Sequence, residues 1–474
     1  MVVGDISTGT EVLVIGAGPG GYVAAIRAAQ LGLDTTLVER DAYGGVCLNR
    51  GCIPSKALIT GADTAHGAAA AEEMGIHADP AVDMAGLQSW KDGVVDQLTG
   101  GVEKLCKANG VNLIEGTAEF ASEGTVRVAH GGEGQGSETL EYEHAIIATG
   151  SRPIEVPGFE FDGEHVLSSK HALNLDSVPE SLVVVGAGYI GMELSTTYAK
   201  LGSDVTVVEM LDAALPAYEG DVGRVVRKRA EELGVEFNFG EGASEWEPQG
   251  EGLRVMTETE GGETATYDAD TVLVAVGRQP VTDTLGLENV GLDLTEQGFL
   301  DTDEYGETDV DGIYAVGDVA GEPMLAHKAS AEGEVVAEVI ADEPSAMDFQ
   351  SIPNAVFTDP EIGTVGMTEA EAEEAGFDPT VGQMPMHASG RALTLRESEG
   401  FVRVVADADT GFLLGAQIVG PEASELIAEV GLAIEMGATL EDVGSTVHTH
   451  PTLSEAVMEA VKNAEDAAIH TLNR

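Results

Sequence analysis

Residues 11–21 read Glu-Val-Leu-Val-Ile-Gly-Ala-Gly-Pro-Gly-Gly, and an Ala-rich segment of helical character follows at 22–31. The apolar run is typical of a buried strand. The glycines of the G-x-G-x-x-G turn that follows it are Gly16, Gly18 and Gly21. A second strand pattern, 34–39, ends in Glu39. This order predicts a dinucleotide-binding unit, in which the glycines admit a pyrophosphate at the helix N-terminus and the acid accepts hydrogen bonds from a ribose.

The same arrangement recurs in residues 181–209. The glycines of its G-x-G-x-x-G turn are Gly186, Gly188 and Gly191. Glu209 closes the unit 23 positions after the first glycine, the same separation as in the first unit. Two units predict two dinucleotides. Glu209 favours NAD over NADP because a carboxylate repels a 2′-phosphate; the alternative is a solvated strand end. Tyr189, inside this turn, either covers the nicotinamide pocket or has a packing role.

Residues 44–56, Gly-Gly-Val-Cys-Leu-Asn-Arg-Gly-Cys-Ile-Pro-Ser-Lys, contain Cys47 and Cys52, two of the three cysteines of the chain. Positions five apart on a regular helix differ by a rise of ~7.5 Å, beyond the ~7 Å that a disulfide spans between Cα atoms. Asn49 and Gly51 would let the backbone bend and close the gap. Two buried thiols or half of a metal site are alternatives, but no further Cys or His zinc ligands lie nearby. The pattern predicts a redox-active dithiol and no metal.

Two further features bear on the reactivity of this pair. A helix that begins near Ile53 and Pro54 would place Cys52 at its N-terminus, which favours the thiolate. Arg50, between the two cysteines, either lowers the pKa of a thiol or points outward. The third cysteine, Cys106, is expected to be an ordinary buried residue.

Three other apolar runs are expected to be strands that end in residues a cofactor can contact. These residues are Thr149 and Gly150 after the first run, Gly277 and Arg278 after the second, and Asp318 after the third. For Asp318, a polar residue of a strand-end turn is the alternative.

After residue 345 the pattern changes to β-rich segments followed by helices, which predicts a third domain of a different type. Near its end the chain reads His-Thr-His-Pro-Thr-Leu-Ser-Glu from His448 to Glu455. Thr452 and Glu455 have the spacing of a capping box. His450 and Glu455 also suit a dyad in which the carboxylate orients the imidazole and raises its basicity. Spacing alone leaves both interpretations open.

The charge of the chain is its most unusual global property. There are 83 acidic and 23 basic residues in 474, a net charge of −60, and only nine of the basic residues are lysines. Such a surface repels nucleic acid and anionic membranes, and no apolar run approaches the ~20 residues of a membrane span. At ~1 M salt the Debye length falls to ~3 Å and screens the self-repulsion. The composition resembles that of proteins from a halophilic, high-salt cytoplasm, so a cytoplasmic protein that loses structure at low salt is expected.

Two nucleotide units, the C-x₄-C pair and His-Pro-x-x-x-Glu, in this order, resemble the flavoprotein disulfide reductases, a pyridine nucleotide-disulfide oxidoreductase family, and within it the dihydrolipoamide dehydrogenase branch. The resemblance runs from Val12 to about Glu465. It implies an α/β fold with two Rossmann-like domains and a C-terminal α+β domain. The expected domains are 1–152 for FAD, 153–276 for NAD, 277–345 for a central segment that completes the FAD site, and 346–474 for dimerisation.

The resemblance also implies roles for individual residues. Cys47 would exchange with the substrate and Cys52 would face the flavin, while His450 and Glu455 would form an acid–base dyad that reaches the disulfide of the other subunit. The remaining residues implied at the flavin site are Lys56, Glu193, Asp318, Ala326 and, more weakly, Ala118. The implied reaction passes electrons from dihydrolipoamide through the cysteine pair and FAD to NAD⁺.

The implied protein is a homodimer whose active sites are shared between subunits. Its partner would be the lipoyl-bearing protein of a 2-oxo acid dehydrogenase or of a glycine cleavage system. The alternatives are another disulfide reductase of the same superfamily, or a flavin-binding structural subunit of a multienzyme complex.

Overall fold

Both apolar runs that precede the glycine turns are inner strands, each paired parallel with both of its neighbours, in the computed structural model, which describes residues 7–131 and 136–473. In the first unit β1 (Ser7–Ile15) lies between β2 (Thr35–Glu39) and β6 (Ser137–Ile147). In the second unit β9 (Ser181–Val185) lies between β10 (Asp204–Glu209) and β15 (Thr271–Val274). Consecutive residues of both runs are buried, the pattern expected where helices cover both faces of a parallel sheet.

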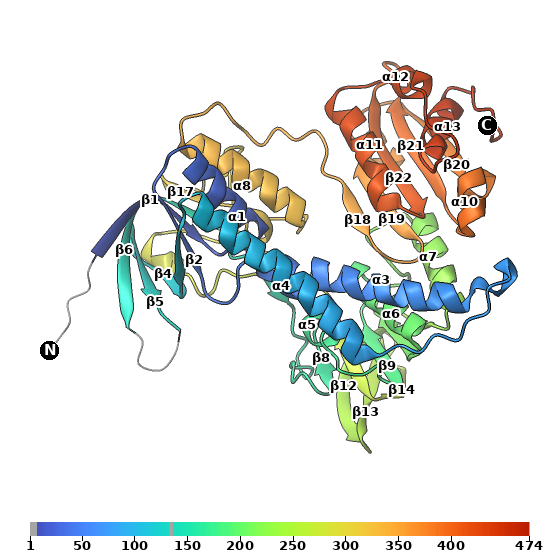
Figure 1. Ribbon diagram of the computed structural model, residues 1–474, viewed down its shortest axis with the longest axis horizontal. Coiled ribbons are helices and arrows are strands. Elements are labelled where there is room, and N and C mark those ends of the chain that lie inside the picture. The colour runs from blue at the N-terminus through green and yellow to red at the C-terminus, as the bar shows by residue number, and fades with distance from the viewer. Residues whose placement is uncertain (1–6, 132–135, 474) are drawn as a thin grey trace.

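The first sheet has seven strands in the order β3-β2-β1-β6-β5-β4, with β17 beside β6. Its other strands are β3 (Asn112–Glu115), β4 (Thr117–Ser122), β5 (Thr125–Ala129) and β17 (Ile313–Ala315). Helices α1 (Pro19–Gln30) and α8 (Ala326–Ile340) pack against each other on this unit, so the chain returns to it after building the second unit (Figure 1). The long helix α4 (Met84–Ala108) extends from the first unit toward the second (Figure 1).

The second unit contains a five-stranded parallel sheet in the order β11-β10-β9-β15-β8 and an antiparallel sheet β12-β13-β14. Their remaining strands are β8 (Val166–Leu167), β11 (Glu236–Phe239), β12 (Glu241–Gln249), β13 (Gly252–Thr259) and β14 (Thr264–Ala269). Two short antiparallel strands, β7 (Ser151–Pro153) and β16 (Arg278–Pro280), join the two units. The helices here are α3 (Cys52–Ala69), which begins in the first unit, α5 (Ser169–Ala172), α6 (Tyr189–Leu201) and α7 (Gly220–Glu232).

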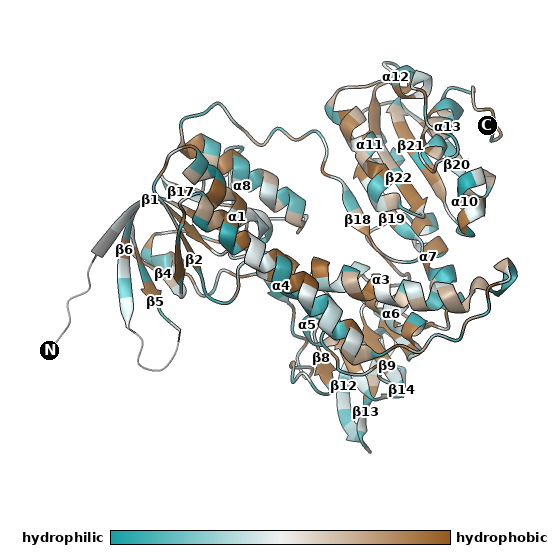
Figure 2. Ribbon diagram, in the orientation of Figure 1, coloured by the Kyte–Doolittle hydropathy of each residue, from teal (hydrophilic) through white to brown (hydrophobic). Residues whose placement is uncertain are grey.

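The third unit is an antiparallel sheet of order β18-β19-β22-β21-β20 covered by helices. Its strands are β18 (Asn354–Val356), β19 (Glu361–Gly366), β20 (Pro379–Pro385), β21 (Phe401–Asp407) and β22 (Leu413–Gly420). Its helices are α9 (Glu369–Glu374), α10 (Gly390–Leu395), α11 (Ala423–Glu435), α12 (Leu440–Ser445) and α13 (Glu455–Ala464). Hydrophobic residues concentrate in the strands and on the helix faces against them (Figure 2). The 3₁₀ turns of the chain are η1 (Ala71–Met74), η2 (Leu287–Asn289), η3 (Gly317–Val319) and η4 (Met386–Ala388).

The predicted architecture, two parallel-sheet units followed by an α+β unit, is confirmed. Across the described ranges 7–131 and 136–473, no helix is both long enough and apolar enough to cross a bilayer.

Candidate active site

A cavity of about 730 Å³ runs from the first glycine turn, past the two cysteines, to the edge of the second unit. It brings together residues that lie far apart in the sequence. The predicted site residues that line it are Gly16, Gly18, Glu39, Cys47, Cys52, Lys56, Ala118, Thr149, Gly150, Tyr189, Glu193, Arg278, Asp318 and Ala326. Most of the residues predicted to contact a flavin therefore surround one volume, together with Tyr189 and Arg278 from the second unit.

Both glycine turns are closed to a side chain at their first and last glycines. Gly16 and Gly186 have positive φ angles of 102° and 104°. A Cβ added at Gly21 would lie 1.8 Å from the carbonyl oxygen of Gly16, and one at Gly191 would lie 2.0 Å from that of Gly186. The helix therefore packs directly on the strand end in each unit, which is the arrangement that lets a dinucleotide approach the backbone. The residues present fit such a group in both units.

The acid at the end of the second strand of each unit is tied to the glycine turn. Glu39 Oε2 accepts the backbone N–H of Ala17 at 2.7 Å. Glu209 Oε2 accepts the N–H of Ala187, also at 2.7 Å. The two units thus repeat not only a sequence pattern but a hydrogen bond, and each carboxylate is fixed at the mouth of its turn.

The cysteines lie on two helices, one short and one long, that meet at Gly51. Cys47 belongs to α2 (Gly45–Arg50), whereas Cys52 is the first residue of α3, one position earlier than the helix start predicted at Ile53. Gly51 makes the bend as expected, because a Cβ there would lie 3.0 Å from the carbonyl oxygen of Val46. Asn49 does not make the bend: it is helical, and its side-chain amide donates to the carbonyl oxygens of Tyr43 and Gly45 at 3.0 and 2.9 Å.

The two thiols have opposite electrostatic environments. A hydrogen bond from Cys47 lowers the pKa of Cys52 to about 7, although burial opposes this shift. The positive charge of Lys56 is the next largest effect that lowers this pKa. The same hydrogen bond, together with burial, raises the pKa of Cys47. Cys52 is therefore the thiolate of the reduced pair and Cys47 the proton donor to it. Arg50 forms an ion pair with Asp41, so its charge is engaged away from the thiols.

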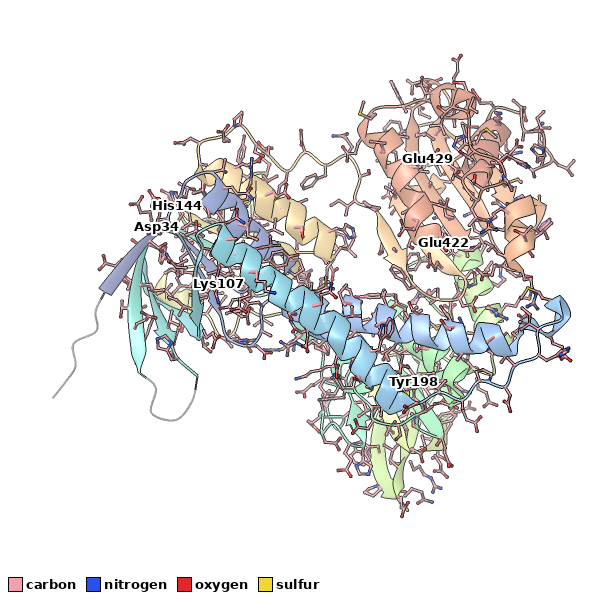
Figure 3. The ribbon with its side chains drawn as sticks, in the orientation of Figure 1. Asp34, Lys107, His144, Tyr198, Glu422 and Glu429 are labelled. Atoms are coloured by element: carbon pink, nitrogen blue, oxygen red, sulfur yellow. The ribbon has the colours of Figure 1, made fainter. Side chains whose placement is uncertain are left out.

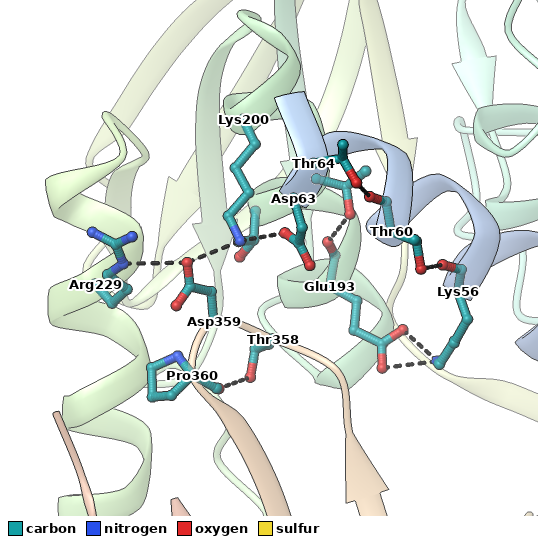
Figure 4. A network of polar contacts seen from close by, with 12 residues as sticks. Lys56, Thr60, Asp63, Thr64, Glu193, Lys200, Arg229, Thr358, Asp359 and Pro360 are labelled. Carbon is teal, nitrogen blue, oxygen red and sulfur yellow. Dashed lines mark hydrogen bonds and ion pairs between the residues drawn. The ribbon is translucent and has the colours of Figure 1, made fainter. Parts of the chain in front are cut away.

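Lys56 and Glu193 form an ion pair in the cavity wall, with Nζ–Oε distances of 2.9 and 3.1 Å (Figure 4). Glu193 Oε1 also accepts the backbone N–H of Phe357 at 2.9 Å, and Lys56 Nζ lies 4.3 Å from the centre of the Phe357 ring. Because these residues come from α3, α6 and the loop after β18, the position of the ammonium group beside Cys52 depends on all three units.

Ser151 is a site residue that the sequence analysis missed. Arg278 donates from Nε to Ser151 Oγ at 2.8 Å and from Nη2 to the Ser151 carbonyl oxygen at 2.7 Å, while Ser151 Oγ donates to the Asp318 carboxylate. This side chain is buried and joins a residue of the predicted nicotinamide side to one of the predicted flavin side. In the sequence, its position directly after Thr149 and Gly150, two residues predicted to contact a cofactor, pointed to this role.

A second missed group supports the same strand end. Glu332 of α8 accepts the backbone N–H of Gly317 at 2.7 Å and pairs with Lys328 at 2.6 Å. Both charged side chains are buried, so they hold the turn that presents Asp318. Their spacing of four on a predicted helix was readable in the sequence, but it does not distinguish a buried pair from a surface pair.

His450 and Glu455 form a pair on the third unit, with Nδ1 and Oε1 2.9 Å apart. The backbone N–H of Thr452, and then the imidazole of His450, hold the pKa of Glu455 below its usual value. Of the two interpretations left open, Thr452 is not the N-cap, because α13 begins at Glu455 with Ser454 as its N-cap. Glu455 accepts the Thr452 N–H at 2.9 Å and still orients the imidazole.

The His450 side chain is 81% exposed and lies outside the lining of the 730 Å³ cavity of its own chain. An imidazole oriented by a carboxylate and facing solvent can exchange a proton with a group on another molecule.

Comparisons with known proteins agree with this geometry. Residues 10–333 match the family model described as pyridine nucleotide-disulphide oxidoreductase, and residues 352–461 match its dimerisation domain. The chain is 73% identical to the dihydrolipoyl dehydrogenase of Haloferax volcanii and 68% identical to that of Halobacterium salinarum, with full coverage of both chains in each case. It is 50% identical to the dihydrolipoyl dehydrogenase of Geobacillus stearothermophilus, also over the full length of both.

Solved structures give the same picture at lower identity. LpdA from Mycobacterium tuberculosis is 28% identical and superimposes with a TM-score of 0.89 over 96% of this chain and 99% of that one. The HOCl-induced flavoprotein disulfide reductase RclA from Escherichia coli is 27% identical, with a TM-score of 0.85 over the same shares.

Proposed function

The chain belongs to the pyridine nucleotide-disulphide oxidoreductase family, and we propose that its reaction within that family is the oxidation of dihydrolipoyl groups with NAD⁺. The full-length relatives named dihydrolipoyl dehydrogenase support this activity. The single observation that carries the proposal is the position of Cys47 and Cys52 in the wall of a cavity that starts at a dinucleotide-type glycine turn. The pKa of Cys52 is lowered and that of Cys47 is raised in this site.

The residues that would hold FAD are those of the first glycine turn, Glu39, Ala118, Asp318 and the start of α8 at Ala326, all around the cavity. The second turn, Glu209 and the Gly277–Arg278 segment would hold NAD⁺. The chemistry that a bound flavin supplies is to accept an electron pair from the dithiol and to pass it on as hydride to a nicotinamide. The domain limits expected from the sequence stay part of the proposal.

The chain's own residues carry the sulfur and proton chemistry. His450 removes a proton from the substrate dithiol, and the resulting thiolate attacks Sγ of Cys47 in the oxidised pair, so that Cys52 leaves as a thiolate. The second substrate thiol then attacks the substrate sulfur of this mixed disulfide while its proton passes to the leaving Cys47 sulfur, which releases lipoamide and Cys47 as the thiol. Glu455 keeps the imidazole oriented throughout. Lys56 stabilises the Cys52 thiolate, whose pKa of about 7 makes it a good leaving group.

The base at each redox pair comes from the partner subunit of a homodimer. Two observations support this assignment. His450 is outside the cavity lining of its own chain and highly exposed, and the unit that carries it matches a dimerisation domain. A dimer that places the third unit of one chain over the cavity of the other completes both sites by symmetry.

The physiological substrate is proposed to be a lipoyl group on a carrier protein of a 2-oxo acid dehydrogenase or glycine cleavage system. We place the reaction in a cytoplasm of high salt concentration. A net charge of −60 needs screening, and free thiols persist where the surroundings are reducing.

Anaerobic titration of the flavin-loaded protein with dihydrolipoamide, in molar KCl, tests the proposal. The expected results are a long-wavelength thiolate–flavin absorption band and, after addition of NAD⁺, formation of NADH. A matched assay of NADPH-dependent glutathione disulfide reduction should give no turnover, since Glu209 opposes a 2′-phosphate. A spectrum that does not respond to dihydrolipoamide would instead indicate a flavin-binding structural subunit, and glutathione turnover would indicate a different reductase of the family.

A further inference from the structure

The loop that presents His450, residues 446–454, is tied to helix α11 by a second histidine. His448 Nε2 lies 2.6 Å from Glu429 Oε1, and its Nδ1 lies 2.9 Å from the carbonyl oxygen of Thr446. Glu429 projects from α11, on the third unit (Figure 3). The His448 side chain is only 5% exposed, in contrast to the 81% of His450 two positions later.

Both ring nitrogens of His448 face acceptors, a carboxylate and a carbonyl oxygen. A neutral imidazole has one N–H and can satisfy only one of them, whereas the doubly protonated ring donates to both. A hydrogen bond to a carboxylate is shorter and stronger than one between two neutral groups. The half-buried position of the pair limits screening by solvent.

The other side-chain hydrogen bonds of the described residues 446–455 are local. Thr446 donates to Asp442 four positions earlier, Thr452 donates to the Thr449 carbonyl oxygen, and His450 contacts Glu455. Near the end of the loop, Leu453 packs in the core of the third unit. The loop therefore has one anchor after His450, which is Leu453, and one before it, which is the contact between His448 and Glu429.

We propose that His448 is a positioning residue: its contact with Glu429 fixes the loop on which His450 reaches the partner subunit's redox pair. His448 does not touch the substrate. It limits the mobility of the loop that carries His450. The contact of His450 with Glu455 orients the imidazole ring but does not hold the loop. This inference rests on the proposed function, because it concerns the proton transfer between His450 and a dithiol.

The test measures two reactions of one flavin-loaded protein. Oxidation of dihydrolipoamide by NAD⁺ needs His450, whereas oxidation of NADH by an artificial acceptor that takes electrons directly from the flavin does not. We expect His448→Asn to lower kcat for dihydrolipoamide about tenfold, because small misplacements of a catalytic group cost one to two orders of magnitude. Artificial-acceptor turnover, flavin content and Tm should stay at wild-type values.

Glu429→Gln removes the same contact from the other side and conserves shape, so it also covers the case in which His448→Asn folds poorly. We expect a comparable loss, and a double variant no worse than His448→Asn alone, since both changes break one interaction. The matched control is His130→Asn in the first unit, where Nδ1 lies 3.0 Å from the Glu115 carbonyl oxygen and Nε2 lies 3.1 Å from Glu138 Oε1. That variant should turn over dihydrolipoamide like the wild type.

The pH profile separates positioning from electrostatic tuning. The acid limb of kcat/KM reports the ionisation of the base, and loss of position should lower the plateau without moving this limb. A limb that moves while the plateau stays would overturn the proposal, as would wild-type kcat in both His448→Asn and Glu429→Gln. A wild-type protein that oxidises NADH with the artificial acceptor but does not accept dihydrolipoamide would overturn the proposed function and this inference together.

Discussion

Lys56 Nζ lies 2.9 Å from Glu193 Oε2, and this ion pair joins the helix that begins at Cys52 to the first helix of the second dinucleotide unit. The Glu193 side chain is 6% exposed and also accepts a backbone N–H from the start of the third unit. The ionisation of a thiol in the first unit therefore depends on how the three units pack. The same dependence applies to most of the chemistry of this site.

Replacing Lys56 with Met should raise the pKa of the Cys52 thiol from its value of about 7. The ammonium group is one of the causes that lower this pKa, so its removal leaves a smaller thiolate fraction at pH 7. Ultraviolet thiolate absorbance of the reduced protein, followed as a function of pH, measures the shift. Arg50→Met is the comparison: because Arg50 pairs with Asp41, its loss should leave the titration unchanged. An equal shift in both variants would contradict the assignment of Lys56.

Mixing two inactive variants should restore activity if the site is shared. A Cys47→Ser homodimer lacks the sulfur that the substrate attacks in both sites, and a His450→Asn homodimer lacks the base in both. A heterodimer has one site with neither residue and one complete site. Random reassortment makes half of the dimers heterodimers, so about a quarter of the wild-type turnover is expected. Turnover with dihydrolipoamide after unfolding and refolding of the mixture in KCl measures it; no recovery would place His450 and Cys47 of one chain in the same site.

The two glycine turns should be separable by substitution. Gly21→Ala places a Cβ 1.8 Å from the Gly16 carbonyl oxygen, so we expect loss of flavin from the purified protein. Gly191→Ala places a Cβ 2.0 Å from the Gly186 carbonyl oxygen, so it should weaken the binding of NAD⁺ while the flavin stays bound. Flavin absorbance and NAD⁺ titration distinguish the two.

The control for both variants is Gly67→Ala in α3, where an added Cβ has no neighbour within 4 Å. This change should leave both cofactors bound. It should raise the free energy of unfolding by about 0.5–1 kcal/mol, since alanine is the better helix former.

Lys200 lies at a junction of the three units and should contribute to stability. Its Nζ contacts Asp63 of α3 at 2.6 Å and Asp359 at 2.9 Å, and Asp359 also binds Arg229 of α7 (Figure 4). Lys200→Met should lower the free energy of unfolding by about 2 kcal/mol, less than for a fully buried pair because both carboxylates are partly exposed. Lys107→Met, at an exposed helix pair on α4 (Figure 3), should cost less than about 0.5 kcal/mol.

The junction also gives this stability a pH dependence. Burial raises the pKa of Asp359, but the charges of Lys200 and Arg229 outweigh it and leave the pKa below its usual value. The contribution is therefore complete above the unfolded-state pKa of about 4 and is lost as pH falls through the folded-state value. Urea unfolding at a fixed KCl concentration, with the wild type and Lys200→Met compared at neutral and acidic pH, should show their difference shrinking in acid.

Stability should rise steeply with salt. The negative side chains that give the chain its net charge of −60 repel one another in dilute buffer. Molar KCl screens this repulsion by shortening the Debye length to about 3 Å. Thermal unfolding followed by circular dichroism from dilute buffer to molar KCl should show a rising Tm. A constant Tm over that range would mean that local ion pairs, rather than the overall charge, decide the stability.

The local features of the site were predictable from the sequence. The two glycine turns, the acids 23 positions later and the bend at Gly51 each depend on residues close along the chain. Spacing determines which backbone atoms meet when the separation is short. Asn49 shows the limit of this reasoning: it was assigned to the bend, but it is helical and its side-chain amide bonds to the carbonyl oxygens of Tyr43 and Gly45.

By itself, the sequence determined that the chain has two dinucleotide-type units, a redox dithiol and a third unit with a histidine–carboxylate pattern. Only the tertiary structure decided that Phe357 of the third unit contacts the Lys56–Glu193 ion pair, that Ser151 joins Arg278 to Asp318, and that His450 lies outside the cavity lining of its own chain. The reason is physical: hydrogen bonds and ion pairs between groups more than a hundred residues apart form only when packing brings those groups within about 3 Å. No spacing rule encodes that distance.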